Sequence, residues 1–393
     1  MNRWIFRCAA AFALLVTIAP ARADFASCMK GVAADAVRSG VSRSTASSAL
    51  DGVTADPKIL ELEQAQPEFK TPIWDYLAAL VDEERVDDGK AAMAANAKSL
   101  ALAERRFGVS KYVVAAIWGI ESDFGRGMGS RPLVQSLATL ACADSQRPRY
   151  FRGELIAALK ILDRGDIPID KLKGSWAGAF GQTQFMPSTF LRLSVDLDGT
   201  GRDVIDNAAA ALGSTANYLK KSGWISGEPW GYEVKLPAGY SGPSGRKNRH
   251  PMSFWKSRGV RRIDGAPLEG EAGGLLLPAG AAGPAFIVTH NFDVIYSYNP
   301  AESYALAAAI LAQQLAGGPG IVTPWPTDDP GLSRVERKEL QKRLADRGYD
   351  VGSADGAIGA KTTSAIADFE GKAGLTVNGR ASRKVLDLLR RQQ

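Results

Sequence analysis

The stretch AAIWGIESDFGRGMG, residues 115–129, passes from apolar residues to a single acid, Glu121, and then into a run rich in glycine. The residues before the acid, from Val113 to Ile120, predict a helix that faces a hydrophobic core. Loss of water raises the pKa of a carboxyl group, so a partly buried Glu121 would stay protonated near neutral pH and act as a general acid. A solvated glutamate at a helix end gives the same pattern, and both readings remain open at this point.

A second stretch, GSWAGAFGQTQFMPSTF at residues 174–190, mixes hydroxyl, amide, aromatic and thioether side chains with glycines just before a predicted helix. Such a loop suits a sugar, because glycine lets the backbone approach closely and Ser175 and Gln184 can form hydrogen bonds. Phe185 and Met186 would add apolar contact. The alternative is an ordinary turn with Phe185 and Met186 in the core.

The first 23 residues have the pattern of a secretory signal peptide. Two arginines precede an apolar segment from Cys8 to Ile18, and residues 21–23, Ala-Arg-Ala, form a small-x-small cleavage site. We therefore expect an exported chain that begins at Asp24. The apolar segment is too short to span a bilayer, and no later one reaches the ~20 apolar residues of a transmembrane helix, so no stable membrane insertion is expected.

The charge of the chain excludes some classes of partner. Cleavage after Ala23 removes Arg3, Arg7 and Arg22 and no acids, so the formal net charge falls from +6 to +3. A weakly basic net charge is compatible with a protein that acts near an anionic cell-wall or membrane surface. The chain lacks the clustered lysines and arginines of a nucleic-acid binder, so no nucleic acid is expected as a partner.

Cysteine and histidine usage limits the redox and metal chemistry. Cys28 and Cys142 remain after cleavage, and an exported pair can form a disulfide, although two buried thiols fit the sequence equally well. The chain holds only two histidines, His250 and His290, without close Cys/His spacing, so neither a metal centre nor another cofactor is expected.

Helix and strand patterns predict a mainly α fold with a small β-containing part. Amphipathic runs rich in Ala and Leu extend from Asp24 to about Leu219. Between Trp224 and Tyr298, the β-like runs GYEVKLP and AFIVTHNFDVIYSY are separated by turns, and ESYALAAAILAQQLAG then returns to helix.

The C-terminal part of the chain has a separate pattern. Residues 317–331 contain four prolines and four glycines, a density that predicts a linker without regular structure. Residues 332–393 then form a compact, charged and helix-rich module near the lower size limit for independent folding.

Four motifs, in this order, resemble the membrane-bound lytic transglycosylase B family of peptidoglycan-cleaving enzymes: GIESDFGRGMGSRPLVQSLATLA, GSWAGAFGQTQFMPSTF, ALGSTANYLKKSGW and YSYNPAESYALA. The resemblance covers most of residues 24–316. It implies a lysozyme-like, mainly α catalytic domain with a smaller β-containing lobe. It also implies a periplasmic location and peptidoglycan glycan strands as the partner.

By this resemblance Glu121 is the sole catalytic acid/base. It would protonate the glycosidic oxygen between N-acetylmuramic acid and N-acetylglucosamine, then accept the proton of the muramic C6 hydroxyl as that oxygen attacks C1. The product is a 1,6-anhydromuramyl end. Ordinary glycosidases need two carboxylates, whereas here the nucleophile is the sugar's own hydroxyl. Asp123 is interpreted as loop structure or a helix cap. A hydrolytic muramidase and a non-catalytic wall-binding protein are the alternatives.

The resemblance also implies a set of residues that contact the sugar. Ser175 would lie near Glu121 and the acetamido group, and Gln184 would hold sugar hydroxyls or the amide. For each tyrosine in the set, the alternative is a core ring whose hydroxyl is satisfied within the protein. The full set is Ser175, Gln184, Phe185, Met186, Tyr218, Asn299 and Tyr304.

Members of the family can carry a calcium loop like that of an EF-hand, and DLDGTGRDVIDN, residues 196–207, stands at the corresponding place. Asn207 replaces the bidentate glutamate of the twelfth position, which disfavours calcium. We expect instead a turn closed by Asp side chains, with Asp206 or Asn207 capping the next helix.

The C-terminal module, residues 332–393, resembles the peptidoglycan-binding domain type 1, a small three-helix bundle, through LADRGYDVG, DGAIGAKTTSAIADFE and GLTVNGRAS. Glu370 stands where the family commonly has Gln. Because the linker separates two self-contained patterns, we expect the module to hold the enzyme on the wall without taking part in bond cleavage. A helical tail without a ligand is the alternative.

Overall fold

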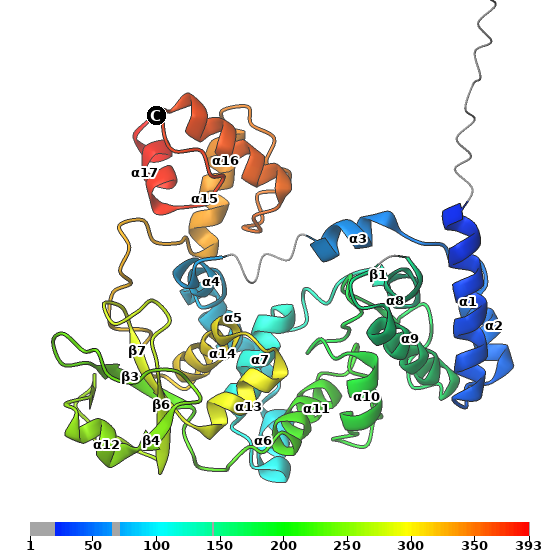
Figure 1. Ribbon diagram of the computed structural model, residues 1–393, viewed down its shortest axis with the longest axis horizontal. Helices are drawn as coiled ribbons and strands as arrows, with labels where there is room; N and C mark the ends of the chain where they lie inside the picture. The colour runs from blue at the N-terminus through cyan, green and yellow to red at the C-terminus, as the bar shows by residue number, and fades with distance from the viewer. Residues whose placement is uncertain (1–19, 65–70, 144, 393) are drawn as a thin grey trace, which may run out of the picture.

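The computed structural model describes residues 20–64, 71–143 and 145–392 (Figure 1). The predicted signal peptide, residues 1–23, lies outside these ranges except for residues 20–23, where the first helix begins. None of the helices in the described ranges combines the length and the apolar character that crossing a bilayer requires.

The main body of the protein is helical, as the sequence predicts, and its strands β1 (Arg131–Pro132) and β2 (Lys173–Gly174) are short. Its helices before the β-containing lobe are α1 (Pro20–Arg38), α2 (Arg43–Leu50), α3 (Pro57–Gln64), α4 (Ile73–Leu80), α5 (Glu83–Ala95), α6 (Ala97–Phe107), α7 (Lys111–Ser122), α8 (Leu133–Cys142), α9 (Pro148–Asp163), α10 (Pro187–Leu193) and α11 (Ala208–Lys221).

The centre of this body is α7, which packs against α14 (Glu302–Leu315). Every residue of α7 from Val113 to Gly119 is buried, and α14 is buried along almost its whole length. A helix that is apolar on all sides has to lie in the interior of a protein. The alanines of α14 let the two helices approach closely, so the end of α7 is fixed deep within the helical body.

The β-containing lobe is an antiparallel sheet with the strand order β4-β6-β7-β3-β5 in the described chain. Figure 1 shows it on one side of the helical body, with α12 beside it. Its elements are β3 (Gly231–Lys235), β4 (Arg249–Pro251), α12 (Met252–Ser257), β5 (Arg261–Arg262), β6 (Ala272–Leu276) and β7 (Ala285–Val288).

One predicted strand is only half correct. The run AFIVTHNFDVIYSY, at residues 285–298, begins as β7, but His290–Tyr298 form helix α13. The aromatic and β-branched residues of this run favour a strand by composition. However, Phe292 and Ile295 are buried three residues apart, which is the spacing of a helix face, and contact with the helical core decides the structure.

The C-terminal module forms the predicted bundle, with α15 (Arg334–Ala345), α16 (Ala360–Lys372) and α17 (Arg383–Arg391) around a small apolar core. Glu370 is 2% exposed, and its carboxylate accepts hydrogen bonds from the backbone N–H groups of Asn378 and Gly379 at 2.7 and 2.8 Å. This side chain therefore shapes the loop after α16 from inside.

The linker, residues 317–331, has no helix, as predicted, but it is held against the β-containing lobe and the helical body. The buried carboxylate of Glu233 in β3 accepts hydrogen bonds from the backbone N–H groups of Val322 and Thr323, both at 2.8 Å. The ring of Trp325 lies 6.5 Å from that of Trp74 in α4. The linker therefore has no regular secondary structure but is fixed in place by its contacts with Glu233 and Trp74.

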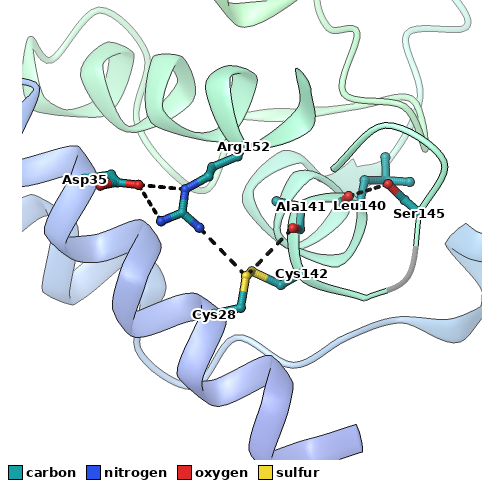
Figure 2. The surroundings of a disulfide bond; sticks show 7 residues. All are labelled: Cys28, Asp35, Leu140, Ala141, Cys142, Ser145 and Arg152. Atoms are coloured by element: carbon teal, nitrogen blue, oxygen red, sulfur yellow. Dashed lines mark hydrogen bonds and ion pairs between the residues drawn. A yellow bond between two sulfur atoms is a disulfide. The ribbon is translucent and has the colours of Figure 1, made fainter. Parts of the chain in front are cut away.

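A disulfide joins Cys28 in α1 to Cys142 at the end of α8, which confirms the pairing that was open from the sequence (Figure 2). Arg152 of α9 lies beside the bond and donates to the carboxylate of Asp35 from Nε at 2.7 Å. The disulfide and this ion pair together attach α1 to the helical body.

Candidate active site

Glu121 is half-buried in the last turn of α7. The hydroxyl of Tyr304, in α14, donates a hydrogen bond of 2.6 Å to Glu121 Oε1. Burial and the neighbouring Glu121 carboxylate raise the pKa of Tyr304 well above its usual value, so this hydroxyl stays protonated and acts as a donor. Tyr304 is 2% exposed, so the carboxyl group of Glu121 is held by the hydroxyl of a ring that is itself fixed in the core.

The backbone around Glu121 is strained. Within the described ranges, the non-glycine residues with positive φ are Asp123 at 53°, Phe124 at 59° and Gln184 at 52°. This left-handed region costs an L-residue about 1 kcal/mol or more, and such residues concentrate at functional sites. Two of them directly follow the last turn of α7, and the third lies in the second quoted stretch.

The turn after α7 places the ring of Phe124 back over the end of that helix. This ring lies edge-on to Trp118, with 5.5 Å between ring centroids, and covers Gly119 of α7 and Gly89 of α5. A Cβ atom on Gly119 would lie 2.5 Å from Phe124 Cζ, closer than real contacts allow. The glycine in WGIES is therefore required so that the chain can fold back over the end of α7.

The second stretch lies directly against the first. β1 and β2 pair antiparallel with Arg131 opposite Gly174, so the loop after Glu121 meets the loop that begins at Ser175. Ser122 donates to the backbone carbonyl of Gln182, and Gln184 Nε2 donates to the carbonyl of Met128 at 3.0 Å. Residues some sixty positions apart thus form one continuous surface around Glu121.

An aromatic group lies next to this surface. The rings of Phe185, Tyr218 and Tyr298 contact one another, with 4.8 Å between the centroids of the two tyrosines. Tyr298 donates to the carbonyl of Thr183, and burial together with the Glu121 charge raises the pKa of Tyr298 well above its usual value. The hydroxyl of Tyr298 is therefore a donor that fixes the second stretch.

Phe185 and Tyr304 differ from their predicted places. Phe185 was expected to line a sugar cleft but is 2% exposed, because Phe180 and Phe185 exchange backbone hydrogen bonds that turn its ring into the core. Tyr304 is also buried and reaches the site only through its hydroxyl. Both residues support the site from within the protein.

The other predicted contact residues are half-buried. Ser175 Oγ accepts the N–H of Ala179 at 3.1 Å, and the Tyr218 hydroxyl donates to the carbonyl of Ser297 at 2.6 Å. Met186 is the N-cap of α10, and Asn299 ends α13. These residues lie on the elements that surround the end of α7, and their contact with substrate stays a prediction.

Asp123 is the carboxylate nearest to Glu121 in sequence, and it is fully engaged in ion pairs. Arg126 and Arg334 each lie 3.0 Å from one of its oxygens, and Arg85 lies 3.3 Å away. Burial alone raises the pKa of Asp123, but the hydrogen bond from Arg126 and the charges of the other two arginines outweigh it and lower that pKa. Asp123 is also the C-cap of α7, so its interpretation as a cap is confirmed.

The site around Glu121 does not coincide with either of two sizeable cavities in the protein. A cavity of about 650 Å³ opens between α6, α7 and the loop before β3, and another of about 1160 Å³ lies along α1 and α2. Glu121 lines neither of them. The site is defined by backbone strain and by the hydrogen bond from Tyr304 to Glu121.

Comparison with known families agrees with this geometry. The model of the family described as Transglycosylase SLT domain matches residues 24–313. The chain belongs to this family. A second model, for a peptidoglycan binding domain, matches residues 333–389, so the SLT transglycosylase domain is followed by a wall-binding domain.

Proteins from Pseudomonas aeruginosa and Escherichia coli are similar to this SLT transglycosylase. SltB3 from Pseudomonas aeruginosa, solved in complex with NAG-anhNAM-pentapeptide, is 44% identical, with a TM-score of 0.75 over 93% of this chain and 99% of SltB3. Slt35 from Escherichia coli, solved in complex with bulgecin A, is 29% identical, with a TM-score of 0.65 over 74% of this chain and 92% of Slt35.

The membrane-bound lytic murein transglycosylase B of Escherichia coli (strain K12) is 34% identical over 214 residues, or 53% of this chain. The match spans 58% of that protein's length. The mainly α, lysozyme-like fold expected from the sequence motifs is thus shared with solved transglycosylases.

The loop at residues 196–207 closes through its own side chains. Asp196 and Asp198 accept the backbone N–H groups of Gly199 and Thr200, and Asn207 caps α11 by accepting from Ala209 and Ala210. This confirms the predicted turn and the Asn207 cap. Slt35 has been solved in complex with calcium. In the described part of this chain, no group of three or more His, Cys, Asp or Glu side chains is arranged to hold a metal ion.

Sequence reasoning missed several residues of the site. Ser122 directly follows Glu121, and Tyr298 lies within the quoted motif YSYNPAESYALA, so both carried a local signal. Arg85 and Arg334 carried none, because each is one of several charged residues at the start of a charged helix. Only the fold brings them to Asp123.

Proposed function

We propose that this chain is an exported lytic transglycosylase that cleaves the β-1,4 bond between N-acetylmuramic acid and N-acetylglucosamine in peptidoglycan and forms a 1,6-anhydromuramyl end. The observation that carries the proposal is the half-buried Glu121, held by the Tyr304 hydroxyl at 2.6 Å at a strained helix end. Membership of the transglycosylase family supports it.

In this reaction Glu121 acts twice. As an acid it gives its proton to the glycosidic oxygen, the bond from that oxygen to C1 of muramic acid breaks, and N-acetylglucosamine leaves as an alcohol. As a carboxylate it then takes the proton of the C6 hydroxyl while O6 bonds to C1. The proton returns to Glu121, and no water is consumed. Tyr304 donates to the Glu121 carboxyl group, protonated in the first step and ionised in the second, and orients it.

Two observations favour this route over ordinary hydrolysis. Asp123 is paired with three arginines and is not available as the second carboxylate of a retaining or inverting glycosidase. SltB3, which is 44% identical, forms a complex with a fragment that contains anhydro-muramic acid. The hydrolytic muramidase remains the second candidate function, since water would attack the same C1.

Around the reacting atoms we infer the following contacts. The Gln184 side chain, whose Nε2 is used within the protein, offers its Oε1 to a sugar hydroxyl or acetamido N–H. Ser175, Met186, Tyr218 and Asn299 would border the sugar chain. The wall-binding domain would retain the exported enzyme on its substrate in the periplasm.

The test is digestion of purified sacculi by the wild type and by Glu121→Gln, followed by mass spectrometry of the products. Anhydromuropeptides from the wild type support a transglycosylase, and reducing ends alone indicate a muramidase. No product from either protein would indicate a non-catalytic protein. Turnover by Glu121→Gln should fall by about 10⁴-fold, because one group serves both proton transfers. Undiminished anhydro product from this variant would overturn the mechanism.

A further inference from the structure

Besides an ion pair of 3.0 Å between Lys338 and Glu84, the C-terminal domain lies against the catalytic domain through two contacts in which an arginine forms ion pairs. In one, Arg380 pairs with both oxygens of Asp75 in α4, at 2.5 and 2.6 Å. In the other, Arg334, the first residue of α15, reaches across to α5 and to the end of α7. Both contacts join the same two domains, but only the second approaches Glu121.

Arg334 contacts the catalytic domain through both its backbone N–H and its side chain. Its N–H donates to Asp82 Oδ2 at 2.7 Å, while Asp82 Oδ1 accepts the N–H of Arg85 at 2.8 Å and so caps α5. One buried carboxylate thus joins the first turns of α5 and α15. The guanidinium of Arg334, in a residue 9% exposed, donates to both Asp123 oxygens, at 3.0 and 3.5 Å.

Asp123 holds the turn that follows Glu121. It is the left-handed C-cap of α7, two residues after Glu121. Arg85 also donates to the carbonyl of Gly119, in the same turn of α7 as Glu121. A two-point guanidinium–carboxylate pair fixes direction as well as distance, unlike a point charge. The three arginines therefore fix both oxygens of Asp123, and one of these arginines comes from the C-terminal domain.

We propose that Arg334 is a positioning residue for Glu121. From the wall-binding domain it holds Asp123, and with it the strained turn that ends α7, so that the Glu121 carboxyl group stays at the Tyr304 hydroxyl. This replaces the expectation that the C-terminal module takes no part in bond cleavage. The inference rests on the proposed function of Glu121. A displacement of ~1 Å at a reacting group can lower a rate by ~10²-fold, so loss of this contact should reduce turnover.

The first experiment compares Arg334→Gln with Arg380→Gln in the full-length chain, on short soluble glycan fragments that do not require wall binding. Each variant removes one arginine that pairs with carboxylates of the other domain: Glu84, Asp88 and Asp123 for Arg334, and Asp75 for Arg380. We expect Arg334→Gln to lower kcat by about tenfold with KM changed by less than about twofold, and Arg380→Gln to keep kcat within about twofold. Arg334→Lys keeps the charge without the two-point geometry and should restore kcat in part.

A second variant shows whether Arg334 acts through Asp123. If it does, Arg334→Gln combined with Asp123→Asn should have the kcat of Asp123→Asn alone, because the two residues share one interaction. Additive losses would overturn the proposal. So would equal kcat losses in Arg334→Gln and Arg380→Gln, or kcat losses that only follow the decrease in Tm.

Hydrogen exchange separates this inference from the proposed function. Peptides that cover residues 119–128 should exchange faster in Arg334→Gln than in the wild type and in Arg380→Gln, whether or not the chain cleaves glycans. A wild type without product would refute the proposed function, while the exchange result still reports on the turn. Unchanged exchange in Arg334→Gln would overturn the role of Arg334.

Discussion

Tyr304 Oη lies 2.6 Å from Glu121 Oε1, and this hydrogen bond joins residues 183 positions apart in the chain. It forms because α7 and α14, both apolar on nearly all sides, pack side by side in the core. The raised pKa of Tyr304, caused by burial and by the Glu121 charge, keeps its proton on the hydroxyl. The packing of two buried helices thereby sets the orientation of Glu121, the proposed acid/base.

Removal of this hydroxyl should therefore impair catalysis. We expect Tyr304→Phe to lower kcat by about 10- to 100-fold, because a hydrogen bond to a charged group is worth about 1.5–3 kcal/mol and here orients the reacting group. The measurement is kcat on soluble glycan fragments. Tyr240→Phe is the control, since it removes a hydroxyl that donates to Pro243 at 2.7 Å in the β-containing lobe. Equal effects of the two variants would count against the orienting role.

The Cys28–Cys142 disulfide should contribute to stability but not to turnover. It joins α1 to α8 across a sequence separation of 114, and a disulfide typically stabilises a protein by about 2–4 kcal/mol. A variant with both cysteines changed to serine should unfold at lower denaturant concentration and still cleave soluble fragments. Thiol labelling of the denatured, non-reduced wild type is the check, and two reactive thiols would contradict the bond.

Acid should weaken the ion pairs around Asp123. The hydrogen bond from Arg126 lowers the pKa of Asp88, and Arg126, Arg85 and Arg334 together lower that of Asp123. A carboxyl whose pKa is lower in the folded chain stabilises the fold above its unfolded pKa, near 4, and this contribution is lost as the pH falls below it.

The wild type should accordingly be more stable than Asp123→Asn near neutral pH, and the difference should shrink as the pH falls from about 4 through the lowered pKa of the folded Asp123, below which the protonated aspartate resembles the amide. Denaturant unfolding of both proteins over this range measures the difference in the free energy of unfolding. A difference that does not change with pH would show that the pairing of Asp123 adds no stability.

The sequence could predict what is encoded locally. Glu121 at the end of an apolar helix, the C-cap role of Asp123 and the Asn207 cap all depend on neighbours in the chain. Helix α13 was predicted as strand because its residue types favour β structure, while contact with the helical core selects the helix. The place of Arg334 beside Asp123, 211 positions away, depends on how two domains meet, and no local pattern encodes that.

Gln184 offers a test of whether backbone strain serves the site. Its φ of 52° is unfavourable for any residue with a Cβ, whereas glycine adopts it at no steric cost. Gln184→Gly and Gln184→Ala both remove the amide that bonds to Met128 and Gly181. The alanine variant keeps the strain of the left-handed backbone, whereas the glycine variant removes it but loses more chain entropy on folding, by about 0.4–1 kcal/mol. Strain of about 1–2 kcal/mol outweighs this entropy, so the glycine variant should be the more stable of the two.

Both Gln184 variants should nevertheless lose activity to a similar extent, because each lacks the amide that we propose contacts the sugar. Denaturant unfolding gives the stability difference, and kcat/KM on soluble glycan fragments gives the functional one. If the alanine variant is more stable than the glycine variant by about 0.4–1 kcal/mol, which is the entropy difference alone, the backbone at this position is not strained. If both variants cleave at the wild-type rate, the Gln184 side chain does not act on the substrate, and the left-handed turn serves only to place Phe185 in the core.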